Sequence, residues 1–438
     1  MAKDSVITAI DLGTDKCVTL VSSVSHETGN LQVLGVSVVK SAGMKKSAIV
    51  DLEKVLATLT QSLDGAERMA GCQVNQAWLS IGGTHIKSQN SKGVVAVAHP
   101  NQEITSEDVE RVIEAAQAVS LPNDRQIIHV IPKDFKVDSQ AGIKDPVGMT
   151  GIRLESEAHI ISGMSTALKN LKKSVVDLGV DEANFVFSGL AAAYSTATET
   201  EKELGVAIVD IGSGSTSICV FVEGSLEYST SLPIGARHIT QDIALGCRIS
   251  LEVAEKIKNL LSQKDEDDLK PRAGESKEEF NRRKKKFDDI DLEKLNLQEE
   301  GCKNLSKKAI TEGIMEPRMK EIFSLIGQEL EKKNLFDLIP AGLIITGGGA
   351  STISMASAAK KTLQLPARVG RPNKLEGLTN DITGPAYATV IGLLEYAYAQ
   401  KNFPIKKTSS FNWQAILPKF KFSLPIGRVA KLVRSLLP

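Results

Sequence analysis

Two short stretches of the chain, 199 positions apart, carry the same acidic turn. Residues 9–16 read AIDLGTDK and residues 209–218 read VDIGSGSTSI, so Asp11 and Asp210 each follow an apolar run and precede glycine and hydroxyl residues. Glycine lets a backbone turn tightly and approach a ligand closely. One such turn is more often an ordinary hairpin. When the same turn occurs twice within the same pattern of flanking segments, it indicates a duplicated architecture.

Each turn lies within three segments that alternate apolar and polar residues. The first frame reads SVITAIDLG, KCVTLVSSV and LQVLGVSVV, and the second, over residues 205–240, reads GVAIVDIG, STSICVFVEG and LEYSTSLPIG. This alternation predicts three strands joined by tight turns in each half. After the first frame, residues 49–71 have helical spacing and end at a glycine. We therefore expect an α/β fold of two related lobes that face a central cleft.

Two further regions interrupt the halves. Residues 80–164 contain several strand-like segments and a helix in which Thr105 precedes Asp108 by three positions, the spacing of a capping box. This region is predicted to be a small α+β insertion. A second insertion, about 245–335, begins with the helical LEVAEKIKNLLSQ, and its middle, 264–300, holds ten basic and thirteen acidic residues. Such a charge run favours a solvated helix or a flexible loop.

The acidic turns have the chemistry of a phosphate and magnesium site. Asp11 and Asp210 are placed to bind a hydrated Mg²⁺, which usually keeps several waters in nucleotide sites. Backbone N–H groups and hydroxyls near the glycines suit phosphate oxygens, and Lys16 supplies a countercharge. The predicted phosphate contacts are Gly13, Thr14, Asp15 and Lys16 from the first turn, and Gly212, Ser213, Gly214, Ser215 and Thr216 from the second.

A glycine run and a charged pair complete the candidate site. Gly347, Gly348 and Gly349 end a buried strand and precede a helix predicted at Ser351, so a flat base can lie against bare backbone beside a helix N-terminus. Glu255 and Lys258 are three positions apart on one helix face, where both can reach a ribose or adenine. A surface ion pair explains the spacing of Glu255 and Lys258 equally well.

Other classes of site are disfavoured. The chain has no G-x-x-x-x-G-K-[ST] P-loop, no Rossmann G-x-G-x-x-G after a strand and no nucleophile elbow. Five scattered cysteines and six dispersed histidines argue against a disulfide framework or a zinc site. The net charge of zero gives no indication of a nucleic-acid partner. Without a leader or an apolar run of about 18 residues, we expect a cytoplasmic protein whose membrane contact is peripheral.

Two acidic glycine turns with a glycine-rich adenosine turn resemble the actin, Hsp70 and sugar-kinase superfamily. Within it, SGLAAAYSTATETEKELGVAIVDIG, the insertion HVIPKDFKVDSQAGIKDPVGMTGIRLESEAHIISG, LIITGGGA and GLTNDITGPAYATVIGLL closely resemble the bacterial cell-division family FtsA, over about residues 5–400. The resemblance implies an actin-like (ribonuclease H-like) fold of two duplicated domains around an ATP cleft, with an inserted 1C-type subdomain and a C-terminal amphipathic helix. The resemblance implies that the first lobe consists of subdomain 1A, residues 1–79, 165–187 and 385–400, with subdomain 1C inserted at 80–164. The second lobe consists of subdomain 2A, residues 188–244 and 336–384, with subdomain 2B at 245–335. A basic linker at 401–423 and a membrane-targeting helix at 424–438 follow.

The resemblance also implies a function. Family members bind ATP with Mg²⁺, form filaments, attach the FtsZ ring to the membrane and recruit later division proteins. The implied partners are the C-terminal peptide of FtsZ through 2B, further copies of the chain, later division proteins through 1C and anionic lipids, with no nucleic acid. The implied location is the cytoplasmic face of the cell membrane at the division site.

The C-terminus supports a membrane contact from its own residues. From Lys401 onward there are eight Lys and Arg and no acidic residue. At about 100° per residue, the apolar residues of 424–438 share one side of a helix and the basic residues share the other, as in a helix that lies in a lipid interface. The residues predicted to meet the membrane are Ile426, Arg428, Val429, Lys431, Leu432, Val433, Arg434, Leu436 and Leu437. The alternative is a helix docked on the protein core.

Departures from the family pattern concentrate in the second turn. The family usually has a triple glycine, a threonine and an aspartate in this turn. This chain has Ser213 in place of the middle glycine, Ser215 in place of the threonine and Ser217 in place of the aspartate. No residue stands out as a general base, so we expect ATP binding with weak ATPase activity. The rival functions are a sugar kinase, an Hsp70-like chaperone and a PilM-like assembly protein, none of which requires the basic C-terminal helix.

Overall fold

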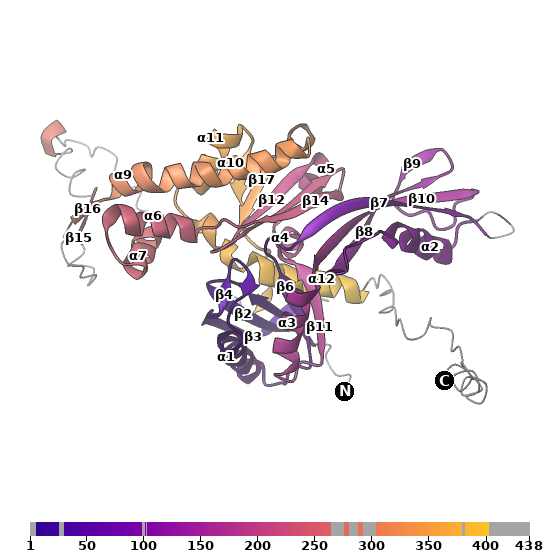
Figure 1. Cartoon of the computed structure of the whole chain (residues 1–438), viewed down its shortest axis with the longest axis horizontal. Helices are drawn as coiled ribbons and strands as arrows, with labels where there is room; N and C mark the ends of the chain where they lie inside the picture. Colours follow the sequence, from indigo (N-terminus) through magenta and orange to yellow (C-terminus); the bar gives the residue numbers. More distant parts are fainter. Residues whose placement is uncertain are drawn as a thin grey trace, which may run out of the picture. The chain divides into compact units, whose positions relative to one another are not determined.

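Two sheets with the same strand order carry the two acidic turns. The first has the order β11-β6-β1-β2-β3-β19 and the second has the order β14-β13-β12-β17-β18. Figure 1 labels β2, β3, β6 and β11 of the first sheet and β12, β14 and β17 of the second. In each, the strand before the turn pairs antiparallel with the next strand, which pairs antiparallel with the third. Two later strands then add parallel on the other side. This shared order confirms the duplicated α/β fold.

The structure is a computed structural model, which describes residues 6–25, 30–98, 101, 103–263, 276–279, 288–291, 304–378 and 382–402. Residues 1–398 form one compact unit, and both sheets belong to it. No helix in the described part combines the length and the apolar character needed to cross a bilayer.

The first lobe surrounds a sheet that is buried on both faces. Its strands are β1 (Val6–Leu12), β2 (Lys16–Val24), β3 (Leu31–Lys40), β6 (Gln76–Ile81), β11 (Glu182–Phe187) and β19 (Glu376–Gly377). Its helices are α1 (Leu52–Ala70), α3 (Ser165–Val176) and α12 (Ala388–Asn402), with the hairpin β4 (Met44–Lys45) and β5 (Ala48–Ile49) before α1. Helix α4 (Ser188–Thr196) contacts strands of both sheets. Because helices cover the sheet, β1 and β2 are buried along nearly their whole length, including the polar residues Thr19, Ser22 and Ser23 of β2.

Helix α1 shows how local sequence sets these boundaries. The Asp51 carboxylate accepts a hydrogen bond from the Lys54 N–H at the N-cap, and Gly71 closes the helix in the left-handed conformation, with a φ of 69°. A side chain at Gly71 would be strained by this φ, which explains the glycine stop. The glycine stop was predicted from the sequence and is confirmed.

The second lobe repeats the plan with different helices. Its strands are β12 (Val206–Ile211), β13 (Thr216–Val222), β14 (Ser225–Leu232), β17 (Leu343–Thr346) and β18 (Ala367–Val369). Its helices are α5 (Glu199–Leu204), α6 (Arg237–Cys247), α7 (Leu251–Ser262), α9 (Lys307–Ile310), α10 (Glu316–Lys332) and α11 (Met355–Leu363), and the small pair β15 (Asp289–Asp291) and β16 (Asn304–Ser306) lies before α9. A π-helical turn, Thr311–Met315, joins α9 to α10. Apolar residues from the sheet and from α6, α7, α10 and α11 form a separate core.

The insertion is a small α+β unit with its own core. Its sheet has the order β7-β10-β8-β9, from β7 (Lys87–Ala96), β8 (Arg125–Val137), β9 (Gln140–Ile143) and β10 (Arg153–Met164). Helix α2 (Ser106–Gln117) packs on one face, and Gly93 allows the contact because a Cβ there would lie 2.1 Å from the Val112 carbonyl oxygen. Thr105 and Asp108 form the predicted capping box. The predicted α+β insertion is confirmed.

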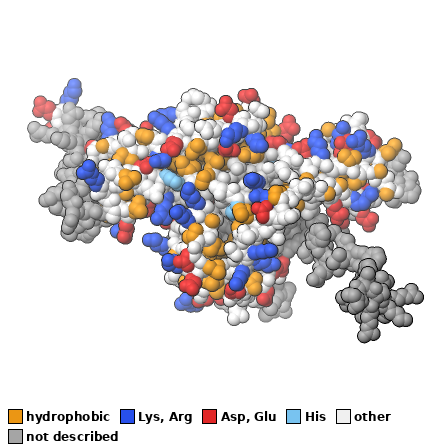
Figure 2. Space-filling view, viewed as in Figure 1, with side chains coloured by type: hydrophobic (Ala, Val, Ile, Leu, Met, Phe, Trp, Pro, Cys, Tyr) orange, Lys and Arg blue, Asp and Glu red, His pale blue; other side chains and the backbone are white. Residues whose placement is uncertain are grey.

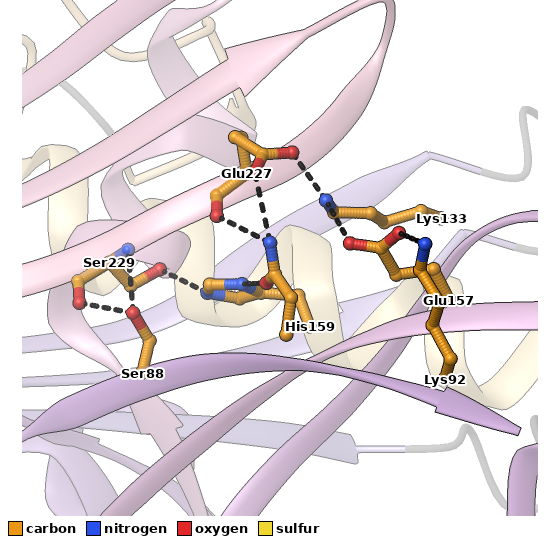
Figure 3. A network of polar contacts seen from close by, with 8 residues as sticks. Ser88, Lys92, Lys133, Glu157, His159, Glu227 and Ser229 are labelled. Atoms are coloured by element: carbon orange, nitrogen blue, oxygen red, sulfur yellow. Dashed lines mark hydrogen bonds and ion pairs between the residues drawn. The ribbon is translucent and has the colours of Figure 1, made fainter. Parts of the chain in front are cut away.

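A joint of polar side chains, with His159 and Ser229 buried at its centre, connects the insertion to β14 (Figure 3). The Ser88 hydroxyl accepts from the Ser229 N–H at 3.0 Å and donates to the Ser229 carbonyl at 2.7 Å, so it replaces a strand partner. His159 Nε2 lies 3.0 Å from the Ser229 hydroxyl, and Nδ1 lies 2.6 Å from Asn90 Oδ1. Because the Asn90 amide nitrogen donates to Glu227, its oxygen faces the ring and His159 donates from Nδ1.

Charged side chains extend this joint toward solvent. Lys133 forms ion pairs with Glu157 of β10 and with Glu227 of β14. Burial, with the Lys133 cation nearby, lowers the pKa of His159 to about 3, so the ring is neutral at physiological pH. The edge strand β14 is therefore covered by polar contacts. Because hydrogen bonds are directional, these contacts fix the position of the insertion against β14 more precisely than apolar packing would.

Two details of the fold differ from the sequence expectations. Strand β19, Glu376–Gly377, lies in the range assigned to the second lobe, yet it pairs with β3 in the first sheet. The helix expected at Ser351 begins at Met355, because Gly348–Ser351 form a 3₁₀ turn and Ser354 adopts a left-handed φ of 64°. The predicted helix start was wrong because the glycines continue into a tighter turn.

Candidate functional site

The two acidic turns meet at one cleft between the lobes. The cleft has a volume of about 1180 Å³ and is lined by both turns, by the glycine run after β17 and by one face of α7. Every predicted phosphate, magnesium and adenosine residue except Thr216 lies on its wall. Residues from distant parts of the sequence thus converge as the duplicated frames require.

The first turn is closed by its own backbone. The Gly13 N–H donates to the Lys16 carbonyl at 3.0 Å, and a Cβ at Gly13 would lie 2.9 Å from the same oxygen. Asp11 accepts a short hydrogen bond from the Ser80 hydroxyl of β6. Burial raises the pKa of Asp11, opposed by the Ser80 hydrogen bond and the charge of Lys16.

The second turn has the same internal bond. The Gly212 N–H donates to the Ser215 carbonyl at 2.9 Å, at the position equivalent to the bond of the first turn. The Ala236 and Arg237 N–H groups, at the start of α6, donate to the Gly212 and Ser213 carbonyls, both at 2.9 Å. The carbonyls of this turn are therefore held toward α6, which leaves its cleft side to donors and hydroxyls.

Asp210, the acid of the second turn, is also perturbed by its surroundings. It accepts a hydrogen bond of 3.1 Å from Thr389 at the start of α12. Burial and the neighbouring Asp11 raise its pKa to about 7. Burial opposes the ionisation of both Asp11 and Asp210. A divalent cation near both groups would favour their ionised, carboxylate forms.

Lys16 lies close to both acids. Its Nζ lies 3.6 Å from the centre of the Tyr387 ring. Burial lowers its pKa, and the charges of Asp11, Asp15 and Asp210 oppose that effect. Lys16 thus places a basic side chain on the cleft wall, near both acids.

The donor set fits magnesium better than a metal held by protein alone. No group of three His, Cys, Asp or Glu side chains within the described ranges is arranged to hold a metal. Two hard carboxylate ligands suit Mg²⁺, which takes its other ligands from water and phosphate. Asp11 and Asp210 would hold it, and the ion would neutralise phosphate charge.

The three glycines after β17 do different work. A Cβ at Gly347 would lie 2.2 Å from Asp210 Oδ1, and one at Gly349 would lie 2.5 Å from the Ile211 side chain. Both therefore allow close packing against the end of β12. Gly348 is exposed, and a Cβ added there would meet no atom within 4 Å, so its bare backbone faces the open cleft. Gly348 is the member suited to a flat base.

Glu255 and Lys258 form an ion pair that also lines the cleft. Lys258 Nζ lies 2.7 Å from Glu255 and 3.0 Å from the Thr240 hydroxyl, which donates to Glu255 at 2.5 Å. Lys258 is buried and Glu255 is partly exposed. The pair is therefore not an ordinary surface pair, and the exposed side of the Glu255 carboxylate suits ribose hydroxyls.

Thr216 and Ser217 have structural partners. Thr216 is fully buried and donates to the Ile234 carbonyl at 2.7 Å, so it does not face the cleft. Strand β13 begins there, and the alternation of the strand turns its side chain inward. Ser217 shares a hydrogen bond of 2.9 Å with Ser188, so the position that has an aspartate in the family pattern keeps a polar anchor.

Several contacts of the site were not predicted from the sequence. Ser80, Thr389 and Thr240 each bond to a predicted residue, and the β4–β5 hairpin contacts both turns. Lone serines and threonines in unrelated segments give no signal of this role. The repeated frames, which predict where the acids converge, give the best available signal.

Charge alone does not make the cleft a polyphosphate site. Among the described residues on its wall, five are Lys or Arg and five are Asp or Glu. Figure 2 shows Lys and Arg side chains gathered on the visible face near the middle of the molecule. Since the wall is balanced, phosphate binding must rely on backbone donors and a bound cation as well as on the basic side chains.

Comparison with known proteins decides the family. A family model described as "SHS2 domain inserted in FTSA" matches residues 83–162, and one described as "Cell division protein FtsA" matches residues 207–392. The cell division protein FtsA of Pseudomonas aeruginosa is 35% identical over 397 residues, which cover 91% of this chain and 90% of that protein. The chain belongs to the FtsA family of cell division proteins. FtsA of Bacillus subtilis is also 35% identical, over 91% of this chain and 84% of that protein.

Solved structures confirm the actin-like fold of this FtsA-family chain. The PilM–PilN type IV pilus biogenesis complex matches with a TM-score of 0.60 at 13% identity, over 90% of this chain and 98% of that chain. MreB5 of Spiroplasma citri bound to AMPPNP matches with a TM-score of 0.50 at 15% identity, over 91% of this chain and 97% of that chain. At these identities the likeness concerns the fold alone.

Parts of the expected FtsA organisation lie outside the described residues. They include most of the charged run 264–300, the linker 403–423 and the helix 424–438 with all of its predicted membrane residues. The described chain extends helix α12 to Asn402, two residues into the expected linker.

Proposed function

We propose that this FtsA-family protein binds Mg²⁺-ATP in the cleft and that the nucleotide controls its assembly into filaments. The observation that carries the proposal is the convergence of the twin turns, with Asp11 and Asp210 on the wall of one cleft. The turns suit the phosphates, Gly348 suits the base, and Glu255 suits the ribose. MreB5 of Spiroplasma citri, which has the same fold, has been solved bound to AMPPNP, and this supports nucleotide binding by the fold.

The chemistry of the site favours slow hydrolysis. The hydroxyls of Ser188 and Ser217, both on the cleft wall, form a hydrogen bond with each other, and a serine hydroxyl is a poor base at neutral pH. The bound Mg²⁺ would supply electrostatic stabilisation of phosphate charge, while Lys16 and the two turns position the phosphates. Steady-state phosphate release by the purified protein should therefore be slow, and rapid turnover would contradict this part of the proposal.

We further propose that filaments of the protein attach the FtsZ ring to the cytoplasmic face of the cell membrane. The segment 245–335 would bind the C-terminal peptide of FtsZ, and the insertion would serve later division proteins. One amphipathic helix binds weakly, since each cation near an anionic surface contributes about 1 kcal/mol. A filament presents many helices at once, so assembly multiplies the attachment.

Liposome sedimentation tests the membrane arm of the proposal. Full-length protein should sediment with anionic vesicles and lose that binding when residues 424–438 are removed. Leu432→Glu, on the apolar side, should weaken binding at least tenfold, and Ser435→Glu adds the same charge on the polar side as a matched control. Equal binding by the full-length and truncated proteins would refute the membrane anchor.

The rival functions make different predictions. A sugar kinase would transfer phosphate from ATP to a small sugar, and a chaperone would bind unfolded polypeptide in a nucleotide-dependent way. The PilM likeness reaches only the fold. Sugar phosphorylation at rates far above ATP hydrolysis would favour the kinase.

A further inference from the structure

The hairpin β4–β5 has an unusual tip. Lys46 and Ser47 both adopt left-handed backbone angles, with φ of 50° and 60°. Two adjacent positive φ values are typical of a tight two-residue hairpin turn, which prefers Asn and Gly. Lys and Ser are disfavoured there, so other contacts must hold the tip in place.

Those contacts come from both acidic turns. The Ser47 N–H donates to the Thr14 hydroxyl of the first turn at 3.1 Å. The Ser47 hydroxyl lies 2.6 Å from the Ser215 hydroxyl of the second turn. One residue therefore links the phosphate turns of the two lobes.

Glycines make room for the tip. A Cβ at Gly214 would lie 3.1 Å from the Lys46 backbone and 3.1 Å from the Thr14 hydroxyl. A Cβ at Gly83, where the chain enters the insertion, would lie 3.2 Å from the Lys46 carbonyl oxygen. The tip is thus seated against bare backbone, in contact with the second turn and with the root of the insertion.

The linked hydroxyls suit a terminal phosphoryl group. Thr14, Ser47 and Ser215 are neutral groups that both donate and accept, and all three lie on the cleft wall. Gly348 and Glu255 mark the expected adenosine end, whereas the hairpin contacts the turns where the phosphates are expected. Hydrogen bonds from hydroxyls to a charged phosphate are stronger than the bond between two hydroxyls.

We propose that the hairpin is a third phosphate loop and that Ser47, paired with Ser215, selects a nucleoside triphosphate over a diphosphate. The inference rests on the proposed nucleotide function and names the group that reads the terminal phosphate. With a triphosphate, both hydroxyls turn from each other to the terminal phosphoryl oxygens. With a diphosphate, they keep their mutual bond, and the contact adds nothing to affinity.

Two substitutions at one position test this hydroxyl clasp in the full-length protein. Ser47→Ala removes the hydroxyl, and Ser47→Gly removes it while relieving the left-handed backbone. Calorimetric titration with Mg²⁺-AMPPNP and with Mg²⁺-ADP should show a five- to tenfold loss of AMPPNP affinity in both variants. ADP affinity should change less than twofold. Ser91→Ala, a partly exposed serine of β7, is the matched control and should change neither.

The outcomes separate the clasp from the site itself. Equal losses for AMPPNP and ADP, or no loss in Ser47→Gly, would overturn the clasp while the nucleotide site stands. A wild-type protein that binds neither nucleotide would overturn the proposed function, and the clasp with it. Selective loss in Ser47→Ala and Ser47→Gly together assigns the effect to the hydroxyl and excludes a collapse of the hairpin.

Discussion

The two lobes share a strand order and a turn geometry but differ in chemistry and in what covers their edges. In both turns a glycine N–H donates to the carbonyl of the residue three positions later, at 3.0 Å in the first turn and 2.9 Å in the second. The first turn carries Lys16, whereas the second carries serines. The first sheet ends at the short strand β19, whereas the second ends at β14 under the polar joint. The copies therefore share a frame, and each has side chains suited to a separate task.

Loss of either turn carboxylate should have the strongest consequence. Asp11→Asn and Asp210→Asn keep the shape of the acid and remove its charge, so the affinity for Mg²⁺-ATP should fall about 100-fold, or about 2.7 kcal/mol. Calorimetry with and without Mg²⁺ measures this loss. Asp64→Asn, on the exposed side of α1, is the control. If one variant stays within threefold of wild type, the turns do not contribute as a pair.

The second prediction concerns pH and distinguishes Asp210 from an ordinary surface acid. Its pKa is about 7 in the folded protein against an ordinary value of 3.8, so the folded state binds the extra proton between these values. The stability of the nucleotide-free protein should therefore fall as pH rises from about 4 to about 7. Asp210→Asn should weaken this trend, since Asp11 and Glu395 also have raised pKa values, and should be more stable than wild type at pH 8 by about 2 kcal/mol.

Urea unfolding at about pH 5 and about pH 8, without nucleotide, checks the pH prediction. Identical pH dependence in wild type and Asp210→Asn would show that Asp210 has an ordinary pKa in the folded protein. The combination of greater stability and weaker nucleotide binding would identify Asp210 as a group kept for function at a cost in stability.

The third prediction compares the two sheet edges. His159→Ala leaves the buried Ser229 hydroxyl and Asn90 without their ring partner, so the free energy of unfolding should fall by about 1.5 kcal/mol. At the first edge, Asn30→Ala removes an exposed hydrogen bond to Glu376 and should cost less than about 0.5 kcal/mol. Urea unfolding of both variants measures the difference. Equal effects would mean that the joint has no special role.

The fourth prediction, with the smallest expected effect, compares an alanine substitution at a glycine of each turn. Gly13→Ala places a methyl group against the carbonyl that closes its own turn and should destabilise the fold by about 1 kcal/mol. Gly214→Ala instead meets the Lys46 backbone, so it should cost less stability and weaken AMPPNP more than ADP. Thermal unfolding and nucleotide titration of both variants test this contrast. A reversed pattern would show that the contact between Gly214 and the hairpin has no part in reading the terminal phosphate.

Local sequence patterns predicted the parts of the fold that depend on near neighbours. The repeated strand frames, the Gly71 stop and the Thr105 capping box depend on neighbours within a few residues, and all are present. The convergence of Asp11 and Asp210 followed from the repeat, because equivalent strands in equivalent sheets place equivalent turns at the same cleft.

Contacts between distant segments could not be predicted from the same patterns. Ser80 lies 69 positions from Asp11, Thr389 lies 179 positions from Asp210, and either residue alone has no distinctive signal. The hairpin tip has no Asn-Gly or Asp-Gly signal, because tertiary contacts of Ser47 hold a backbone that its own sequence disfavours. The prediction that Thr216 contacts phosphate was wrong for a related reason. Its side chain points into the core because β13 begins at Thr216, and the sequence pattern does not give that starting residue.

Whether both turns hold one and the same Mg²⁺-nucleotide can be decided by a double-mutant cycle. Asp11→Asn, Asp210→Asn and the double variant would each be titrated with Mg²⁺-ATP. If one ion is shared, the double variant should bind about as weakly as the weaker single variant, so that the two losses are strongly non-additive. Losses that add in full would show that the two carboxylates act independently, which is incompatible with a shared ion.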